Sequence, residues 1–229
     1  MSDKWKEQTV AVAIDGPSGA GKSTIAKLLA KELQFIYVDT GALYRAIGYM
    51  ALRRGISLQD AAGIEALLPD LRVEIRYMDG SQRVLVNGED VSDKIRTPDV
   101  SMAASAVSSL PAVRRFLLDL QRDMAKTNNV IMDGRDIGTV VLPDARVKIF
   151  LTASAEVRAR RRFEELKEKG VPTTYDEVLA DMEKRDYDDS HRAAAPLKAA
   201  EDAILVDTSS LDLDGAVSAI KAVVEKALG

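Results

Sequence analysis

Apolar and polar positions in the first forty residues follow the order of a strand, a loop, a helix and a second strand. Residues 9–14 form a short apolar run rich in β-branched side chains, and residues 35–38 form another, as buried strands do. Between them, apolar side chains recur at helical spacing from Ser23 onward. They are Ile25, Leu28, Leu29 and Leu33. This alternation predicts a parallel sheet with helices on both faces.

The pattern changes at residue 71. Residues 71–77 alternate with period two, and a short apolar run follows at residues 83–86. Asp79-Gly80 supplies a turn between them, so this stretch predicts an antiparallel hairpin. Because such a hairpin does not belong in a parallel core, we place an inserted small domain at residues 64–96 and the core at residues 1–63 and 97–229.

The remaining periodicity completes an α/β chain. Apolar runs predict further core strands at residues 130–132, 147–151 and 203–206. Helical spacing predicts helices at residues 42–54, 98–108, 111–126 and 214–228. Two more helices begin at capping residues: Ser154 for a helix to residue 169, and Thr174 with Glu177 for a helix through residue 184. We predict a three-layer α/β fold with a central parallel sheet, the small antiparallel insertion and a short helical lid at about residues 155–190.

The loop after the first strand matches the phosphate-binding pattern G-x-x-x-x-G-K-[ST] of P-loop NTPases. Glycines let several backbone N–H groups point at an anion, and the start of the following helix adds its positive dipole end. We expect Lys22 to reach the β- and γ-phosphates and Ser23 to ligate Mg²⁺. A glycine-rich turn of purely structural use is the alternative. The residues expected to bind the donor, called the phosphate loop below, are Gly16, Pro17, Ser18, Gly19, Ala20, Gly21, Lys22, Ser23 and Thr24.

Three carboxylates end predicted strands near this loop. Asp133 closes an apolar strand as a Walker B aspartate does, and Asp15 and Asp39 also follow strands. Any of the three is placed to hold Mg²⁺ through water. For each, an aspartate that merely caps a turn is the alternative, and the sequence does not choose among them.

Composition excludes several kinds of site. The 229 residues contain no cysteine and one histidine, His191, which excludes thiolate zinc sites, iron–sulfur clusters, cysteine nucleophiles and histidine triads. The polar start at residues 1–8 and the short apolar runs contain no membrane span, so we expect a soluble, cytoplasmic protein. The net charge of −4 does not favour a partner such as a nucleic-acid polymer. Eight of the 18 arginines nevertheless lie between Arg135 and Arg192, which predicts a local anion site.

A phosphate loop alone does not identify the reaction. The chain contains no Asn-Lys-x-Asp guanine-binding tetrapeptide, and its acidic balance gives no support to a translocating ATPase. Many arginines and few candidate bases suit phosphoryl transfer, in which the protein mainly positions two anions and neutralises charge. The alternatives are a kinase for another small acceptor and a nucleotide-binding switch protein with little turnover.

The predicted helix after Ser154 carries a dense group of arginines. Arg158, Arg161 and Arg162 recur at i, i+3 and i+4 and share one face, whereas Arg160 points elsewhere. Such a face is able to close over a triphosphate and stabilise the transferred group. The alternative is a solvated helix whose arginines pair with its own acidic residues, Glu164, Glu165 and Glu168.

Several segments resemble the bacterial cytidylate kinase family, over essentially the whole chain. They are Ile14-Asp-Gly-Pro-Ser-Gly-Ala-Gly-Lys22, Val38-Asp-Thr-Gly-Ala-Leu-Tyr-Arg45, Ile95-Arg-Thr97, Asp133-Gly-Arg-Asp-Ile-Gly-Thr-Val-Val141, Pro143-Asp-Ala145, Lys148-Ile-Phe-Leu151 and Arg192-Ala-Ala-Ala-Pro-Leu197. The resemblance implies an enzyme that transfers the γ-phosphoryl group of ATP to CMP or dCMP with Mg²⁺, and we take a monomer as the default expectation. It also implies catalytic roles for Lys22, Arg135 and the lid arginines.

The resemblance further implies an acceptor site. The CMP phosphate would bind Arg45 and Arg135. The cytosine would contact Thr40, Arg114, Asp136 and Arg192, and the pentose would contact Ser105, Arg185 and Asp189. Cytosine offers an amine to Asp136, whereas uracil would turn a carbonyl toward it, an unpaired contact that costs on the order of 1–3 kcal/mol.

Overall fold

The computed structural model describes residues 9–78 and 80–228. The polar segment expected at residues 1–8, and Asp79 of the expected turn, lie outside the described residues. The chain divides into two compact units. The first comprises the chain up to residue 37 and from residue 128 onward, and the second comprises residues 38–127. Each unit is described by itself.

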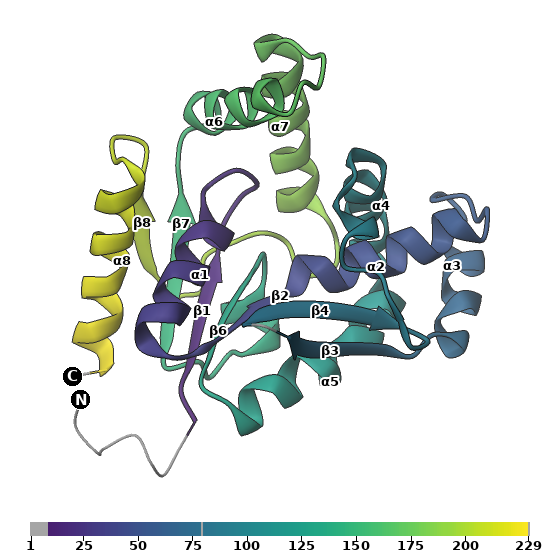
Figure 1. Cartoon of the computed structure of the whole chain (residues 1–229), viewed down its shortest axis with the longest axis horizontal. Helices are drawn as coiled ribbons and strands as arrows, with labels where there is room; N and C mark the ends of the chain where they lie inside the picture. The colour runs from purple at the N-terminus through teal and green to yellow at the C-terminus, as the bar shows by residue number, and fades with distance from the viewer. Residues whose placement is uncertain (1–8, 79, 229) are drawn as a thin grey trace. The chain divides into compact units, whose positions relative to one another are not determined.

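The first unit is built on a five-stranded sheet with the strand order β2-β6-β1-β7-β8 (Figure 1). The strands are β1 (Ala11–Asp15), β2 (Ile36–Asp39, which begins in this unit), β6 (Val130–Gly134), β7 (Val147–Thr152) and β8 (Ile204–Asp207). β1 pairs in parallel with β6 and β7, and β7 pairs in parallel with β8. The register places Asp15 beside Gly134 and Phe150. The predicted parallel core is confirmed.

Helices α1 (Lys22–Leu33) and α8 (Leu213–Leu228) bury their apolar sides in a cluster shared with the sheet. Ile25, Leu29 and Ile220 are fully buried there. Leu28, which the periodicity placed on the buried face of α1, is instead 39% exposed. Ala26 and Ala30 complete the buried face, because they lie beside Ile25 and Leu29 while Leu28 turns away from them.

Helices α6 (Ala155–Glu168) and α7 (Tyr175–His191) form the predicted lid. They pack on a small cluster around Ala159, Val178 and Met182. Ser154 caps α6, and Thr174 with Glu177 forms the predicted capping box at the start of α7. The expectation that this second helix ends near residue 184 is wrong, because the helix continues to His191. No glycine or proline occurs between residue 184 and Pro196 to end it earlier.

The second unit joins helices to the predicted hairpin. Its elements are α2 (Thr40–Arg53), α3 (Ala61–Leu67), η2 (Leu68–Asp70), β3 (Val73–Met78), β4 (Ser81–Val86), β5 (Glu89–Asp90), η3 (Lys94–Arg96), α4 (Pro98–Ser108) and α5 (Pro111–Thr127). β3 and β4 are antiparallel, as predicted, and the short β5 adds a third antiparallel strand. This unit is longer than the insertion placed at residues 64–96, since α2, α4 and α5 share its hydrophobic cluster.

Close helix packing in the second unit depends on a glycine. A Cβ at Gly48 of α2 would lie 2.9 Å from the Cβ of Ala103 and 3.0 Å from the backbone of α4. Leu43 and Ile47 on the same helix are fully buried. Helix α2, which carries two of the candidate acceptor residues, is therefore held firmly within this unit.

A single turn of π-helix, η4 (Ile137–Val141), follows β6 and was not predicted. It lies at the carboxyl end of the sheet, where open α/β sheets bind their ligands. No helix among residues 9–78 and 80–228 is long and apolar enough to cross a membrane.

Candidate active site

The phosphate loop leaves the carboxyl end of β1 and enters α1, as the sequence predicts. Gly16 has a φ of 147°, and a Cβ there would lie 1.9 Å from the carbonyl oxygen of Leu151 in β7. Glycine is required at this position because no side chain fits between the loop and β7. Gly21, with a φ of 87°, directly precedes the first residue of α1. Because glycine has no side chain, it does not cap the N–H groups at the start of this helix. The arrangement suits an anion at the helix start.

Lys22 is buried, with 6% of its surface exposed, and its Nζ donates to the carbonyl oxygen of Pro17 at 2.6 Å. Burial lowers the pKa of Lys22 well below its ordinary value, and the nearby charge of Arg135 lowers it further, whereas Asp133 and Asp15 oppose the shift. A bound polyphosphate would favour the charged form of Lys22, because it adds negative charge beside a desolvated ammonium group.

The structure separates the three candidate magnesium carboxylates. Oδ2 of Asp133 accepts a hydrogen bond from Oγ of Ser23 at 2.7 Å. Both oxygens of Asp15 accept backbone N–H groups of η4, and in the second unit Asp39 accepts from the N–H of Ala42 and from Arg45. Asp133 is therefore the carboxylate beside the hydroxyl of Ser23, whereas Asp15 bonds the backbone of η4 and Asp39 bonds residues of α2.

The pair formed by Ser23 and Asp133 fits a magnesium ion. A hydroxyl and a carboxylate are hard oxygen ligands, and Mg²⁺ in nucleotide sites commonly takes one or two of these and completes its shell with phosphate oxygens and water. No cluster of three or more His, Asp or Glu residues suited to a metal occurs in the described part of the chain. Ser23 and Asp133 suit a metal that takes its other ligands from phosphate oxygens and water.

Sequence reasoning missed Tyr37, which completes this group. Its hydroxyl donates to Oδ1 of Asp133 at 2.9 Å. The ammonium group of Lys27 lies 5.5 Å from the centroid of its ring. Nothing in the apolar run of β2 distinguishes this tyrosine from a packing residue, so no sequence signal predicts the contact.

The three lid arginines take different partners. Arg158 is buried, and its guanidinium group bonds both oxygens of Asp186 on α7, at 3.1 and 2.5 Å, and the carbonyl oxygen of Ser18 in the phosphate loop, at 3.0 Å. Arg161 donates to the carbonyl oxygen of Thr208, at 2.9 Å. Arg162 pairs with Glu165 on its own helix, at 2.7 Å. Of the three, Arg158 contacts the phosphate loop in this structure.

Asp186 is a second residue that sequence reasoning missed. It lies three residues before Asp189, so the two carboxylates share one side of α7. Extending the predicted helix beyond residue 184 would have shown this spacing.

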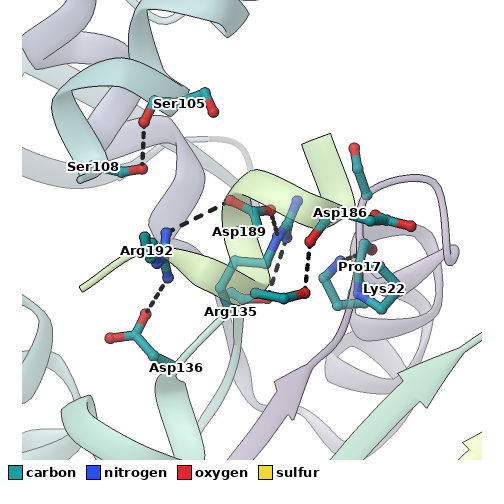
Figure 2. A network of polar contacts seen from close by, with 12 residues as sticks. Pro17, Lys22, Ser105, Ser108, Arg135, Asp136, Asp186, Asp189 and Arg192 are labelled. Atoms are coloured by element: carbon teal, nitrogen blue, oxygen red, sulfur yellow. Dashed lines mark hydrogen bonds and ion pairs between the residues drawn. The ribbon is translucent and has the colours of Figure 1, made fainter. Parts of the chain in front are cut away.

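Four candidate acceptor residues come together in the first unit (Figure 2). Asp189 lies between two arginines: its Oδ2 accepts from Nε of Arg135 at 3.0 Å, and its Oδ1 is 3.7 Å from Nη1 of Arg192. Nη2 of Arg192 is 3.9 Å from Oδ1 of Asp136. Asp136, Asp189 and the Arg192 side chain are all buried. The positive charge of Arg185, on α7, contributes to the lowered pKa of Lys22, which places this arginine near the phosphate loop.

The other candidate acceptor residues lie in the second unit. Thr40 is buried at the start of α2, and Nη2 of Arg45 bonds Oδ2 of Asp39 at 2.8 Å. Arg114 of α5 donates to the carbonyl oxygen of Ser108 at 3.0 Å and lies over the ring of Tyr44. The carbonyl oxygen of Ser105 accepts a hydrogen bond from the Ser108 hydroxyl at 2.9 Å.

Comparison with known proteins gives a consistent result. Residues 12–226 match the family model described as cytidylate kinase. The chain is 51% identical over 220 residues to the cytidylate kinase of Caldicellulosiruptor saccharolyticus, covering 96% of this chain and 97% of the relative. It is 53% identical over 218 residues to that of Caldanaerobacter subterraneus, covering 95% and 96%. The identity to the Carboxydothermus hydrogenoformans cytidylate kinase is 53% over 207 residues, covering 90% and 93%. The glycine loop, the buried arginine and carboxylate network and this likeness over nearly the full length agree: the chain belongs to the cytidylate kinase family.

Proposed function

We propose that this protein transfers the γ-phosphoryl group of ATP to CMP or dCMP, giving ADP and CDP or dCDP. Membership of the cytidylate kinase family supports the reaction. The observation that carries the assignment within the structure is the buried network of Arg135, Asp136, Asp189 and Arg192, in the same unit as the phosphate loop. It offers carboxylate acceptors and guanidinium donors side by side, as a pyrimidine monophosphate requires.

The donor side follows from the phosphate loop. Its backbone N–H groups and Lys22 bind the phosphates of ATP, and Ser23 with Asp133 would hold Mg²⁺. An ion held there would supply positive charge that offsets the charge developing on the transferred phosphoryl group. Lys22 stabilises the same charge from the protein. Because both nucleotides bind together, no covalent enzyme intermediate is needed.

The lid arginines extend this positive charge. Arg158 already reaches the loop carbonyl of Ser18, so it fixes the loop in place and brings its charge close to the phosphates. Arg161 and Arg162 would have to exchange their present partners, Thr208 and Glu165, for phosphate oxygens when the lid closes. Arg158 likewise bonds Ala153, Ser18 and Asp186, so a direct contact with a phosphate would require it to exchange a partner as well.

The roles on the acceptor side follow from the sequence resemblance. Asp136 would accept the exocyclic amine of cytosine, while Arg192 and Arg114 would donate to its O2 and N3. Arg45 and Arg135 would take the phosphate with their guanidinium forks. Thr40 would contact the base. Ser105, Arg185 and Asp189 would contact the pentose.

One assay separates this function from the alternatives. ADP release is measured through a coupled reaction with CMP, dCMP, UMP, AMP and shikimate as acceptors, using the wild-type protein and the Lys22→Ala variant. CMP and dCMP should be phosphorylated at least tenfold faster than UMP or AMP, as expected for about 1–3 kcal/mol of discrimination. Faster turnover with shikimate would identify a different kinase, and nucleotide binding without acceptor-stimulated ADP release would indicate a switch protein.

We extend the proposal to a monomer that acts in the cytoplasm. The absence of cysteine is compatible with a reducing compartment, and the monomer is the default expectation. Light scattering on the purified protein, with and without both nucleotides, measures the mass directly. A measured mass of twice 24.9 kDa would indicate a dimer and contradict the proposed monomer.

A further inference from the structure

The side chain of Asp15 bonds the backbone of a segment that is distant in sequence. It is the last residue of β1, directly before the phosphate loop, and only 4% of its surface is exposed. Its Oδ1 accepts the backbone N–H of Ile137 and its Oδ2 accepts the backbone N–H of Gly138, each at 2.7 Å. The carboxylate therefore binds the start of η4 through both oxygens, although it lies more than a hundred residues away in sequence.

These contacts enclose two residues of the acceptor network. The β1–β6 ladder places Asp15 beside Gly134, which fixes the chain on one side of Arg135 and Asp136. The Asp15 carboxylate fixes the chain on the other side, at Ile137 and Gly138. Arg135 and Asp136 are the two residues between these attachment points. Their side-chain directions consequently depend on where the carboxylate holds η4.

The chemistry of this contact requires a carboxylate. A carboxylate offers an acceptor at both oxygens, whereas the isosteric amide of asparagine offers one acceptor and places N–H donors against a backbone N–H. Burial raises the pKa of Asp15 to about 6, and the two backbone N–H groups oppose that rise by stabilising the charged form. The buried charge thus has its compensation in these two contacts.

Gly138 is the second backbone partner of the Asp15 carboxylate. A Cβ at this position would lie 3.4 Å from Oδ2 of Asp15 and 3.3 Å from the Cγ of Lys148. A single Cβ there would be in van der Waals contact with the carboxylate and slightly closer to the flexible Lys148 side chain, so a branched side chain at Gly138 would press on the contact while leaving Asp15 itself unchanged.

We propose that Asp15 is a positioning residue for acceptor recognition: its carboxylate holds the backbone that presents Arg135 and Asp136, although Asp15 itself belongs to the donor side of the fold. This inference rests on the proposed function for the identity of the acceptor. Both of its oxygens bond η4, so we assign Asp15 no direct contact with either nucleotide or with the metal. Its loss should therefore weaken acceptor binding more than donor binding.

The test compares Asp15→Asn with Asp212→Asn. Asp212 also accepts a backbone N–H, that of Gly215 at 2.8 Å, but at the exposed start of α8. For each variant, the KM values for CMP and ATP are measured, and calorimetry gives the dissociation constants of CMP and ADP separately. Asp15→Asn should raise the KM and dissociation constant of CMP about tenfold and those of the adenine nucleotide less than twofold. Asp212→Asn should leave all four values within twofold of the wild type.

Gly138→Val provides a second variant with an intact carboxylate and a side chain large enough to press on it. It should reproduce the selective loss of CMP affinity, and it keeps the proposal testable if Asp15→Asn does not fold, which circular dichroism would show. Equal losses for donor and acceptor, or unchanged CMP binding, in the folded variants would overturn the positioning role. The acceptors are first compared with the wild-type protein. If CMP is not phosphorylated, the proposed function is wrong. The selective loss of affinity is then measured with whichever monophosphate the protein uses.

Discussion

Ser23 and Asp133 lie on different elements, α1 and β6, and the hydroxyl of Ser23 donates to Oδ2 of Asp133 at 2.7 Å. The parallel pairing of β1 with β6 brings them together, because both the phosphate loop and Asp133 lie at the carboxyl ends of these strands. This contact distinguishes Asp133 from the other two strand-terminal carboxylates.

Asp133→Asn should lower kcat on the order of 10- to 100-fold, because it removes a charged oxygen ligand beside Ser23. CMP affinity should change little. The measurement is turnover across a series of Mg²⁺ concentrations, together with calorimetric binding of ADP with and without the ion. Tyr37→Phe, which removes one hydrogen bond to Asp133, should have the same effect at roughly a tenth of the size. Wild-type magnesium dependence in Asp133→Asn would contradict the assignment.

Lys22→Ala should abolish detectable turnover while CMP still binds. The buried ammonium group contributes charge at the transferred phosphoryl group in a site shielded from water, where electrostatic contributions are largest. Lys31→Ala is a suitable control, since Lys31 is an exposed lysine of the same helix. Single-turnover kinetics and CMP titration measure the two effects separately. Activity of Lys22→Ala within a factor of ten of the wild type would remove its catalytic role.

Gln82→Ala tests how the small sheet supports the acceptor-phosphate arginine. The Gln82 side chain donates to the carbonyl oxygen of Asp39 at 3.1 Å and accepts from its N–H at 2.9 Å, while Asp39 holds Arg45. Losing both bonds should cost about 1–3 kcal/mol of unfolding free energy and raise the KM for CMP several-fold. Urea unfolding and steady-state kinetics measure these quantities.

Gln59→Ala is the matched control for Gln82→Ala. Gln59 is an exposed glutamine of the same unit, so the same substitution there should leave stability and the KM for CMP unchanged. If the two variants behave alike, the contact between Gln82 and Asp39 has no role in acceptor binding.

Asp136→Asn should weaken the discrimination between CMP and UMP. An amide at this position is able to donate to the O4 carbonyl of uracil, whereas the carboxylate accepts only from the amine of cytosine. The ratio of kcat/KM for CMP to that for UMP should fall about tenfold or more. An unchanged ratio would remove Asp136 from the base-recognising group.

Stability should depend on pH through Asp15. Burial raises its pKa from 3.8 to about 6, so between these values the folded protein binds a proton that the unfolded chain does not. The contribution of Asp15 to the unfolding free energy therefore falls as pH rises from about 4 to about 6, by up to about 3 kcal/mol, and is constant above about 7. Urea unfolding of the wild type and Asp15→Asn between pH 4 and 8 gives this difference. A difference that rises with pH would contradict the shift.

Much of the fold could be predicted because its signals are local. The phosphate loop occupies consecutive residues, the hairpin alternates with period two, and Thr174 and Glu177 are three residues apart in one capping box. Each of these patterns is determined by neighbouring residues, and each is confirmed in the structure.

The site was less predictable because its contacts join distant segments. The sequence placed three carboxylates at strand ends, but their hydrogen-bond partners separate them: Ser23 for Asp133, η4 for Asp15 and α2 for Asp39. Helical spacing put Arg158, Arg161 and Arg162 on one face, yet α7 and the segment after β8 supply the partners of Arg158 and Arg161. Tertiary packing makes these two choices, and residue spacing does not contain them. Arg162 instead pairs with Glu165 on its own helix, which is the alternative that the sequence offered.

The central claim is direct transfer between two bound nucleotides, and ³¹P NMR of the protein with ATP, CMP and Mg²⁺ tests it most directly. The resonances of CDP and ADP should grow together in equal amounts, with no inorganic phosphate. Formation of ADP and inorganic phosphate without CDP would contradict it.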